Sequence, residues 1–392
     1  MTDRMTSINP QMLIWAREVS GTSLHEAEEK FGRKLAEWET GKEFPSYAEL
    51  KKIGDYYRKP IAVFFFPEPP KLKNIPASCR TLPIEGSQLF DRNLTKVVDW
   101  ARSMQLNLYE LHHNINPSPY KLSQIEFDLT SLDATSNQLR SILGISLEKQ
   151  KKFNKRDTAF EQWRSSFLEL GIYIFKNAFK NDLISGFCIY DSEFPVICIN
   201  NSFAHSRQIF TLFHELYHLI CKTSGVDLLD DSSLENQEID QNNKINFEIE
   251  QKCNRFAGAF LVPNSDFLNI SKTMRFTDEQ IIECSDLYSV SRDVILHKLL
   301  ENKIINYGFY LEKSEQFRKD YFRVVNFDEN GKKKGNGNYY RTHVAYIGTQ
   351  YLELAYKNYY TKKISLPQLS QYLDMKIHGV KVIAAQKGWG AI

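Results

Sequence analysis

The stretch Phe210-Thr211-Leu212-Phe213-His214-Glu215-Leu216-Tyr217-His218-Leu219-Ile220 carries the strongest structural signal in this chain. Residues four apart lie on one face of a helix, so His214 and His218 can offer two imidazoles to one metal ion. Glu215 lies one step round the helix, beside that ion. Zinc-dependent hydrolysis needs two fixed neutral nitrogens, a third ligand, a place for water and a carboxylate that takes its proton. The stretch therefore predicts a helix with two metal ligands and a general base.

The alternative interpretation is an accidental spacing of two helical histidines that are solvated or satisfied in the core. The flanking residues oppose it, because they make the helix apolar on much of its surface and predict that it is buried. Buried ionisable side chains need partners or a metal. The metal interpretation is therefore the stronger one. The apolar flanking residues are Phe210, Phe213, Leu216, Leu219 and Ile220.

A third ligand is expected on a second amphipathic helix over residues 249–263, which ends near Pro263. Glu250 opens this predicted helix, and Glu248 is a rival at nearly the same place. An acidic residue near a helix N-terminus also interacts favourably with the macrodipole. From the residues alone, the ligand and macrodipole interpretations of Glu250 are about equally supported.

The two segments FTLFHELYHLI and EQKCNRFAGAFLVP together resemble the ImmA/IrrE family of zinc-dependent endopeptidases. Its members carry H-E-x-x-H followed by E-x-x-[AC]-N-x-F-A-x-x-[FL]-[LM]-x-P. The resemblance implies His214, His218 and Glu250 as metal ligands with gluzincin-like chemistry, and Glu215 as the catalytic residue. It covers most of the chain from residue 8 to about residue 310, including Gly186-Phe187, Pro195 to Asn200 and Arg207 to Phe210, and is looser beyond.

The pattern of elements predicts an α+β fold that is mainly helical, with a zincin-like peptidase core around a small sheet. Strands are expected at 171–175, 186–190 and 196–199 from their β-branched and aromatic content. In this plan an extended peptide adds to the sheet edge by β-augmentation, and strand 196–199 is the expected edge. The expected domains are 1–70 (helix-turn-helix-like bundle), 71–125 (linker and long helix), 126–310 (metallopeptidase) and 311–392 (C-terminal helical unit).

Residues 1–70 resemble the helix-turn-helix domain of phage-repressor-like (XRE-type) regulators, with helices expected at 24–31 and from Leu35 to Gly41. Only three steps separate Gly32 from Leu35, so about one turn of the recognition segment is missing. What remains carries Glu37 and Glu39, which are expected to repel phosphate. Two interpretations stay open: the domain binds a DNA sequence, or it is a degenerate helix-turn-helix that serves folding or docks a repressor protein, and the second is somewhat favoured.

Several other features carry weaker signals. His112-His113 suggests a metal site, but adjacent helical residues point apart, so a polar surface is favoured. His205 is expected in the loop before this helix, where stabilisation of an oxyanion is one interpretation and a solvated role is the favoured one. The acidic stretch 225–244 is interpreted as a solvated excursion. Residues 326–340 look like turns, and the Tyr-rich, basic 339–375 suits either nucleic acid or a helical partner.

Composition is that of a globular protein, with 42% hydrophobic and 25% charged residues in 392. The net charge of +2 provides no global basic field that would demand nucleic acid. The six cysteines show no C-x-x-C spacing, which favours reduced thiols. The first nine residues lack the apolar segment of a signal peptide, and no apolar run is long enough for a membrane span. A cytoplasmic location is expected.

Together these observations predict a zinc-dependent endopeptidase, and imidazole–carboxylate sites also accept Mn²⁺ or Fe²⁺. The family resemblance implies a narrow substrate: a repressor- or antitoxin-like DNA-binding protein whose cleavage controls gene expression. DNA is a second expected partner, through the N-terminal domain. The alternative function is a DNA-binding transcriptional regulator or antitoxin with a vestigial peptidase site.

Overall fold

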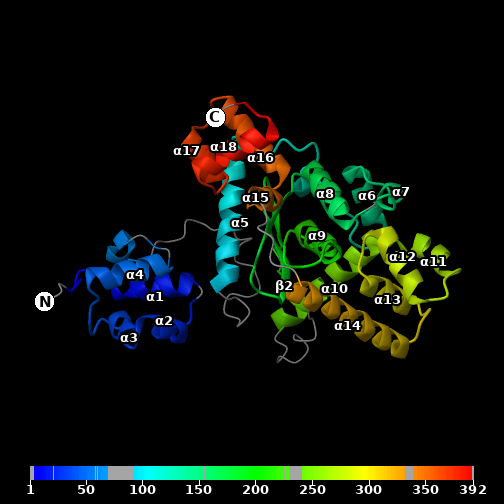
Figure 1. Cartoon of the computed structure of the whole chain (residues 1–392), viewed down its shortest axis with the longest axis horizontal. Coiled ribbons are helices and arrows are strands. Elements are labelled where there is room, and N and C mark those ends of the chain that lie inside the picture. Colours follow the sequence, from blue (N-terminus) through cyan, green and yellow to red (C-terminus); the bar gives the residue numbers. More distant parts are fainter. Residues whose placement is uncertain are drawn as a thin grey trace. The chain divides into compact units, whose positions relative to one another are not determined.

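The structure, a computed structural model, describes residues 4–20, 22–57, 59, 61–68, 92–153, 155–224, 226–228, 241–331 and 339–390. Contacts divide the chain into two compact units, Met1–Trp100 and Ala101–Ile392, and the division falls within one helix, α5 (Figure 1). The predicted linker at 71–83 and most of the acidic stretch 225–244 lie outside the described residues. The finer domain boundaries at 70, 125 and 310 stay predictions.

The first unit is a small helical bundle with its own core. Asn9 and Ser23 cap the first two helices through side-chain hydrogen bonds to backbone N–H groups. The core is formed by buried side chains such as Met12, Trp38 and Phe64. The elements are α1 (Pro10–Val19), α2 (Leu24–Phe31), α3 (Lys34–Glu39), α4 (Tyr47–Tyr57) and a 3₁₀ helix (Ile61–Phe65).

The junction between α2 and α3 is as short as the sequence predicted. Gly32 ends α2 with φ +79°, a backbone conformation that favours glycine, and α3 has six residues. One expectation was wrong: Glu39 is not a surface carboxylate that repels phosphate. It is buried, and the Arg17 guanidinium donates to both of its oxygens at 2.8 and 3.0 Å.

The second unit contains a four-stranded sheet with the order β1-β3-β2-β4. β3 pairs in parallel with β1 and antiparallel with β2, while β4 pairs antiparallel with β2. The prediction that strand 196–199 forms the sheet edge was therefore wrong, because β3 is central. The strands are β1 (Tyr173–Asn177), β2 (Ile184–Ile189), β3 (Val196–Asn200) and β4 (Val226–Leu228).

Helices cover both faces of this sheet, which explains why β1, β2 and β3 read as continuous apolar runs. Ile174 faces the layer that contains α8 and α9, whereas Phe175 packs on Tyr351 of α16. The helices of the unit are α5 (Arg92–Leu111), α6 (Leu132–Leu143), α7 (Leu147–Gln150), α8 (Arg156–Ser166), α9 (His205–Ile220), α10 (Gln241–Leu261), α11 (Asn264–Ser271), α12 (Asp278–Tyr288), α13 (Arg292–Glu301), α14 (Tyr307–Gly331), α15 (Tyr339–Ile347), α16 (Thr349–Tyr360), α17 (Leu366–Tyr372) and α18 (Ile377–Lys387). Short 3₁₀ helices occupy Leu122–Gln124 and Phe167–Leu170.

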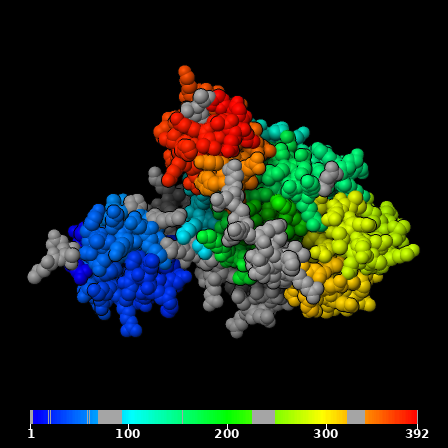
Figure 2. Space-filling model, in the orientation of Figure 1, coloured from blue at the N-terminus to red at the C-terminus, as the bar shows by residue number. Residues whose placement is uncertain are grey.

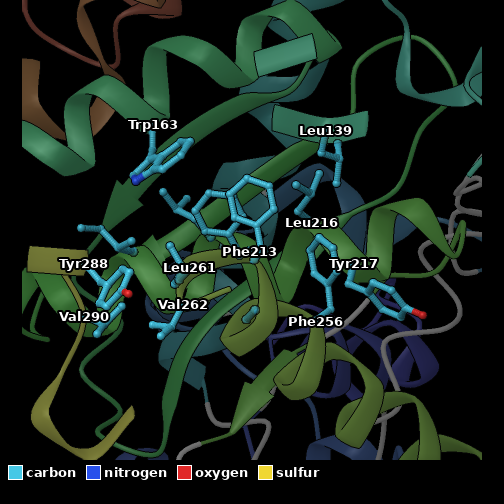
Figure 3. Close-up of a cluster of buried hydrophobic side chains, with 14 of the residues drawn as sticks. Leu139, Trp163, Phe213, Leu216, Tyr217, Phe256, Leu261, Val262, Tyr288 and Val290 are labelled. Carbon is cyan, nitrogen blue, oxygen red and sulfur yellow. The ribbon is translucent and has the colours of Figure 1, made fainter. Parts of the chain in front are cut away.

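The largest core lies where α9 meets α8 and α10. Phe213 of α9 contacts Trp163 edge-on at 4.9 Å and stacks on Phe260 at 4.3 Å between ring centroids. Figure 3 shows Phe213 among apolar side chains that come from several helices. Helices α11 to α13 pack beside α6 to α8, as Figure 2 shows. Gln150 of α7 links these groups, because it donates to the carbonyls of Leu261 and Tyr288. This core fixes the position of α9.

The edge strand β1 is joined to the C-terminal helices by a buried arginine. Arg164 of α8 donates to the carbonyl of Ile174 in β1 and to the carbonyls of Ala345 and Tyr346 in α15. Burial lowers the pKa of this guanidinium, against the opposing charge of Glu161. The β1 edge is thus covered by the chain itself.

Other element boundaries differ from the sequence predictions. Residues 326–331, expected as turns, continue α14 to Gly331, and 332–338 lie outside the described residues. His112 is not on a polar surface: its Nε2 lies 2.7 Å from the Tyr173 hydroxyl, and its ring stacks on Phe194. None of the helices in the described part of the chain has both the length and the apolar character of a membrane span.

Candidate metal centre

α9 brings the two predicted histidine ligands to one face of a buried helix. Nearly every residue from Ser206 to Ile220 is buried, so the helix is held on all sides by packing rather than by its capping residue. His214 and His218 are 1% and 2% exposed. Their Nε2 atoms lie 3.3 Å apart, so both rings present the same nitrogen to one point.

Glu250 of α10 supplies the third group at that point. Its Oε2 lies 3.0 Å from His214 Nε2, and its Oε1 lies 3.2 Å from His218 Nε2. Ligands on a tetrahedral zinc at its usual bond lengths are separated by about 3.3 Å. The three separations therefore suit a shared metal ion, and the residues present fit zinc.

Two further side chains fix the tautomers of the histidines. Asn254 Oδ1 lies 2.9 Å from His214 Nδ1 and can only accept, so Nδ1 donates and the lone pair is left on Nε2. Thr223 donates its hydroxyl to the His218 carbonyl, and its oxygen lies 3.4 Å from His218 Nδ1. Such outer hydrogen bonds orient metal-binding imidazoles in proteins.

The electrostatics of the cluster favour a cation. Two lone pairs on nitrogen and a carboxylate meet within 3.3 Å, an arrangement that needs a proton or a positive ion between the atoms. Burial alone would raise the pKa of Glu250. When the imidazoles carry protons on the nitrogens that face Glu250, their hydrogen bonds and positive charge outweigh burial and lower the pKa of Glu250 to about 2. Glu250 is therefore an ionised carboxylate, as a metal ligand must be.

Cys253 is a nearby residue that the sequence prediction did not include. The ligand atoms of His214, His218 and Cys253 all lie within 4.8 Å of one another, so the Cys253 thiol is a further potential metal ligand. Glu250 fits a shared ion better, because its oxygens lie closer to the imidazoles. The signal for Cys253 and Asn254 was their spacing of three and four residues after Glu250, which places them on the same face of α10.

Three other residues were candidates for the site: Glu215, Glu248 and His205. Glu215 is fully buried on α9 between the two histidines. Glu248 is exposed, and two residues turn a helix by about 200°, so it lies away from the side that carries Glu250. His205 begins α9 and lies beside Phe160, about 13 Å along the helix from His214.

The position of Glu250 within α10 excludes the macrodipole interpretation of this residue. The prediction that Glu250 opens its helix was wrong, because α10 begins at Gln241. Glu250 lies more than two turns into the helix, where the macrodipole has little influence. Favourable charge near a helix N-terminus therefore does not explain this carboxylate, whereas contact with two imidazoles does.

Comparison with known proteins assigns a family resemblance to the segment that holds the cluster. No curated protein matches the chain. Residues 168–300, about a third of the chain, match the family model Peptidase_M78, described as the IrrE N-terminal-like domain. The matched segment contains β1 to β4, both helices of the histidine–glutamate cluster and α11 to α13. The match supports a metallopeptidase of the ImmA/IrrE type in this segment.

Proposed function

We propose that this protein is a zinc-dependent endopeptidase in which His214, His218 and Glu250 hold the metal. The observation that carries the proposal is the meeting of two imidazole Nε2 atoms and one ionised carboxylate at a single point. Asn254 and Thr223 support it, because they leave the Nε2 lone pairs available. Mn²⁺ and Fe²⁺ suit the same donors and are the alternatives that metal analysis distinguishes.

Glu215 is the proposed general base. A bound zinc ion would polarise the scissile carbonyl and make water acidic at neutral pH. Glu215 is next to His214 in sequence and is held rigidly by the packing of α9, so its carboxylate can stay in one position through the reaction. It takes the proton of the attacking water and passes it to the leaving amine.

The proposed substrate is a repressor- or antitoxin-like DNA-binding protein, cut to change gene expression. Two features support it: the resemblance to ImmA/IrrE peptidases, and a separate N-terminal helical bundle that suits docking of a protein partner. The competing function is a DNA-binding regulator with a vestigial site. The completeness of the ligand set and its outer hydrogen bonds opposes that function, since a vestigial site has no need to keep them.

The test combines metal content with proteolysis in the full-length protein. Glu215→Gln should keep stoichiometric zinc, because Glu215 is not a ligand, and should lose about 10²- to 10⁴-fold in cleavage rate. The substrates are intact repressor-like proteins and a peptide library from digested cell protein, with products identified by mass spectrometry. Wild-type cleavage by Glu215→Gln, or no cleavage by zinc-loaded wild type in either assay, would refute the proposal.

A further inference from the structure

The Cys253 thiol lies beside the histidine–glutamate cluster and has no part in the function proposed above. Its sulfur and one ring nitrogen from each of His214 and His218 all lie within 4.8 Å of one another, and all three residues are buried. Of the five cysteines that the structure describes, Cys253 is the one grouped in this way with two histidines. Two imidazoles, a carboxylate and a thiol therefore meet in the same part of the core.

The geometry of α10 explains how the thiol reaches this position. Cys253 follows Glu250 by three residues, so the two side chains lie on one face of the helix. Ligands three residues apart on one helix can share a metal site, as glutamate and histidine do in helical bundles that bind two metal ions. Asn254 follows Cys253 directly and lies 2.9 Å from His214 Nδ1, so this side of α10 is directed at the imidazoles.

The separations suit zinc after a small movement of the sulfur. Zinc–sulfur and zinc–nitrogen bonds of about 2.3 and 2.0 Å place the two ligand atoms about 3.5 Å apart in a tetrahedral site. The outer limit of 4.8 Å exceeds that separation by about 1.3 Å. A change in the side-chain torsion of Cys253, with a small adjustment of the histidine rings, covers a difference of this size.

Packing alone is the alternative explanation of Cys253, since a buried cysteine can behave as a small apolar residue. Cys253 is fully buried and belongs to the core that α8, α9 and α10 share. An alanine would also suit a small apolar position, and it forms helices better than cysteine does. Packing does not explain why the sulfur lies beside two imidazoles, whereas metal binding does.

A thiolate would change the preference of the cluster among metals. Imidazole and carboxylate accept Zn²⁺, Mn²⁺ and Fe²⁺, whereas thiolate is a soft ligand that favours zinc over manganese. Two imidazoles, one carboxylate and one thiolate also fill the four positions of tetrahedral zinc. A set that is filled in this way leaves no position for the attacking water.

We propose that the Cys253 thiolate is a fourth zinc ligand of the substrate-free protein, beside His214, His218 and Glu250. The inference rests on the proposed endopeptidase function and adds a protein ligand to its three. The thiol proton passes to solvent as the zinc–sulfur bond forms. Because the thiolate occupies the position that the attacking water needs, it leaves the zinc before cleavage.

X-ray absorption spectroscopy of the full-length, zinc-loaded protein measures this ligand directly. Wild type should show one sulfur at about 2.3 Å from zinc, in addition to nitrogen and oxygen ligands at about 2.0 Å. Cys253→Ala should lose the sulfur signal and keep the others. Cys284→Ala is the matched control, because Cys284 is a buried cysteine of α12 outside this group of side chains. It should keep the sulfur signal.

Cobalt substitution and metal competition give two further readouts. With Co²⁺ in place of zinc, a thiolate ligand adds a strong charge-transfer band in the near ultraviolet. Wild type and Cys284→Ala should show this band, whereas Cys253→Ala and Cys253→Ser should not. Serine keeps nearly the size of cysteine, so it separates loss of the thiolate from loss of packing. In competition with a chelator, Cys253→Ser should bind zinc at least about tenfold more weakly, with a smaller change for Mn²⁺.

The outcomes separate this inference from the proposed function. A wild-type zinc spectrum without sulfur, or an unchanged spectrum in Cys253→Ala, overturns the inference, while cleavage by wild type still upholds the endopeptidase. A sulfur signal that disappears in both Cys253 variants and stays in Cys284→Ala upholds the thiolate ligand. That result stands even if no protein is cut, an outcome that removes only the proposed endopeptidase function.

Discussion

At the scale of single residues, the cluster depends on which nitrogen of each histidine carries a proton. Asn254 fixes the proton of His214 on Nδ1, and Thr223 is placed to do the same for His218. The two Nε2 atoms therefore face the carboxylate oxygens of Glu250 across a space where a cation would be shared. Neither feature follows from the H-E-x-x-H spacing, which specifies only that the rings share a helix face.

Removing a ligand should remove the metal. His214→Ala and His218→Ala should each lose stoichiometric zinc, because a three-ligand site holds the ion poorly with two. Glu250→Gln should weaken binding. Glu248→Gln is the control, since that carboxylate is exposed and should have no effect. Metal content of purified proteins gives the answer, and loss in Glu248→Gln with retention in Glu250→Gln would reverse the assignment of the third ligand.

Asn254 should matter for affinity through His214. Asn254→Leu removes the acceptor for His214 Nδ1–H and should weaken zinc binding about 10- to 100-fold. Asn254→Asp keeps an acceptor of the same shape, so it should bind zinc more tightly than Asn254→Leu does. Competition with a chelator of known affinity measures both. Equal zinc affinity in the two variants would show that Asn254 has no part in orienting the ring.

His112 should make stability sensitive to acid. Burial, with smaller contributions from His113 and Lys357, lowers its pKa from the ordinary value to about 4. Below pH about 6.5 the unfolded chain takes up a proton that the folded chain resists, so stability falls as pH drops toward 4. His112→Asn should show a smaller loss of stability between pH 7.5 and pH 5 in urea titrations.

The neighbouring histidine provides the control for this pH effect. His113 has its ring 3.1 Å from the Lys363 ammonium and is exposed. His113→Asn removes only a contribution to the His112 pKa that is smaller than burial, so it should keep most of the wild-type difference in stability between the two pH values. The interpretation fails if His112→Asn loses as much stability on acidification as wild type does.

At the scale of helices and strands, the sequence predicted what local pattern controls. The apolar stripe and the H-E-x-x-H spacing placed α9 correctly, and β-branched runs located three strands within a few residues. The start of α10 was missed, because Gln241, Asn242 and Asn243 carry no helical stripe. The position of β3 was missed because its parallel pairing with β1 depends on residues more than twenty apart, which no local pattern encodes.

Arg164 should be a main determinant of how β1 joins α15. Its donors satisfy the buried carbonyl of Ile174 and the partly buried carbonyls of Ala345 and Tyr346, and Arg164→Met leaves them without that partner. The loss in free energy of unfolding should be about 3 kcal/mol or more. Arg156→Met, on the same helix, removes an exposed pair with Asp286 and a 3.2 Å hydrogen bond to Ser285 Oγ, and should cost about 1 kcal/mol. Urea titration compares them, and equal losses would contradict this role.

At the scale of the whole molecule, the N-terminal unit has the size of a DNA-binding domain but offers few groups to DNA. In repressor-type domains the second helix of the pair enters the major groove. α3 has six residues, of which Leu35, Trp38 and Glu39 are buried. Lys34 and Glu37 are its exposed residues, and their charges are opposite. With a net charge of +2 on the chain, no global field compensates.

We therefore expect the N-terminal unit to dock a protein rather than to select a DNA sequence. Selection from random duplexes with the full-length chain should enrich no common sequence. Residual binding should fall only about tenfold between 50 and 200 mM salt, as for two phosphate contacts. Removing residues 1–70 should leave the zinc content unchanged but raise the amount of enzyme needed to cut a repressor-like protein. An enriched DNA sequence whose binding is abolished by Arg33→Ala or Lys34→Ala would instead establish sequence-specific recognition through the start of α3.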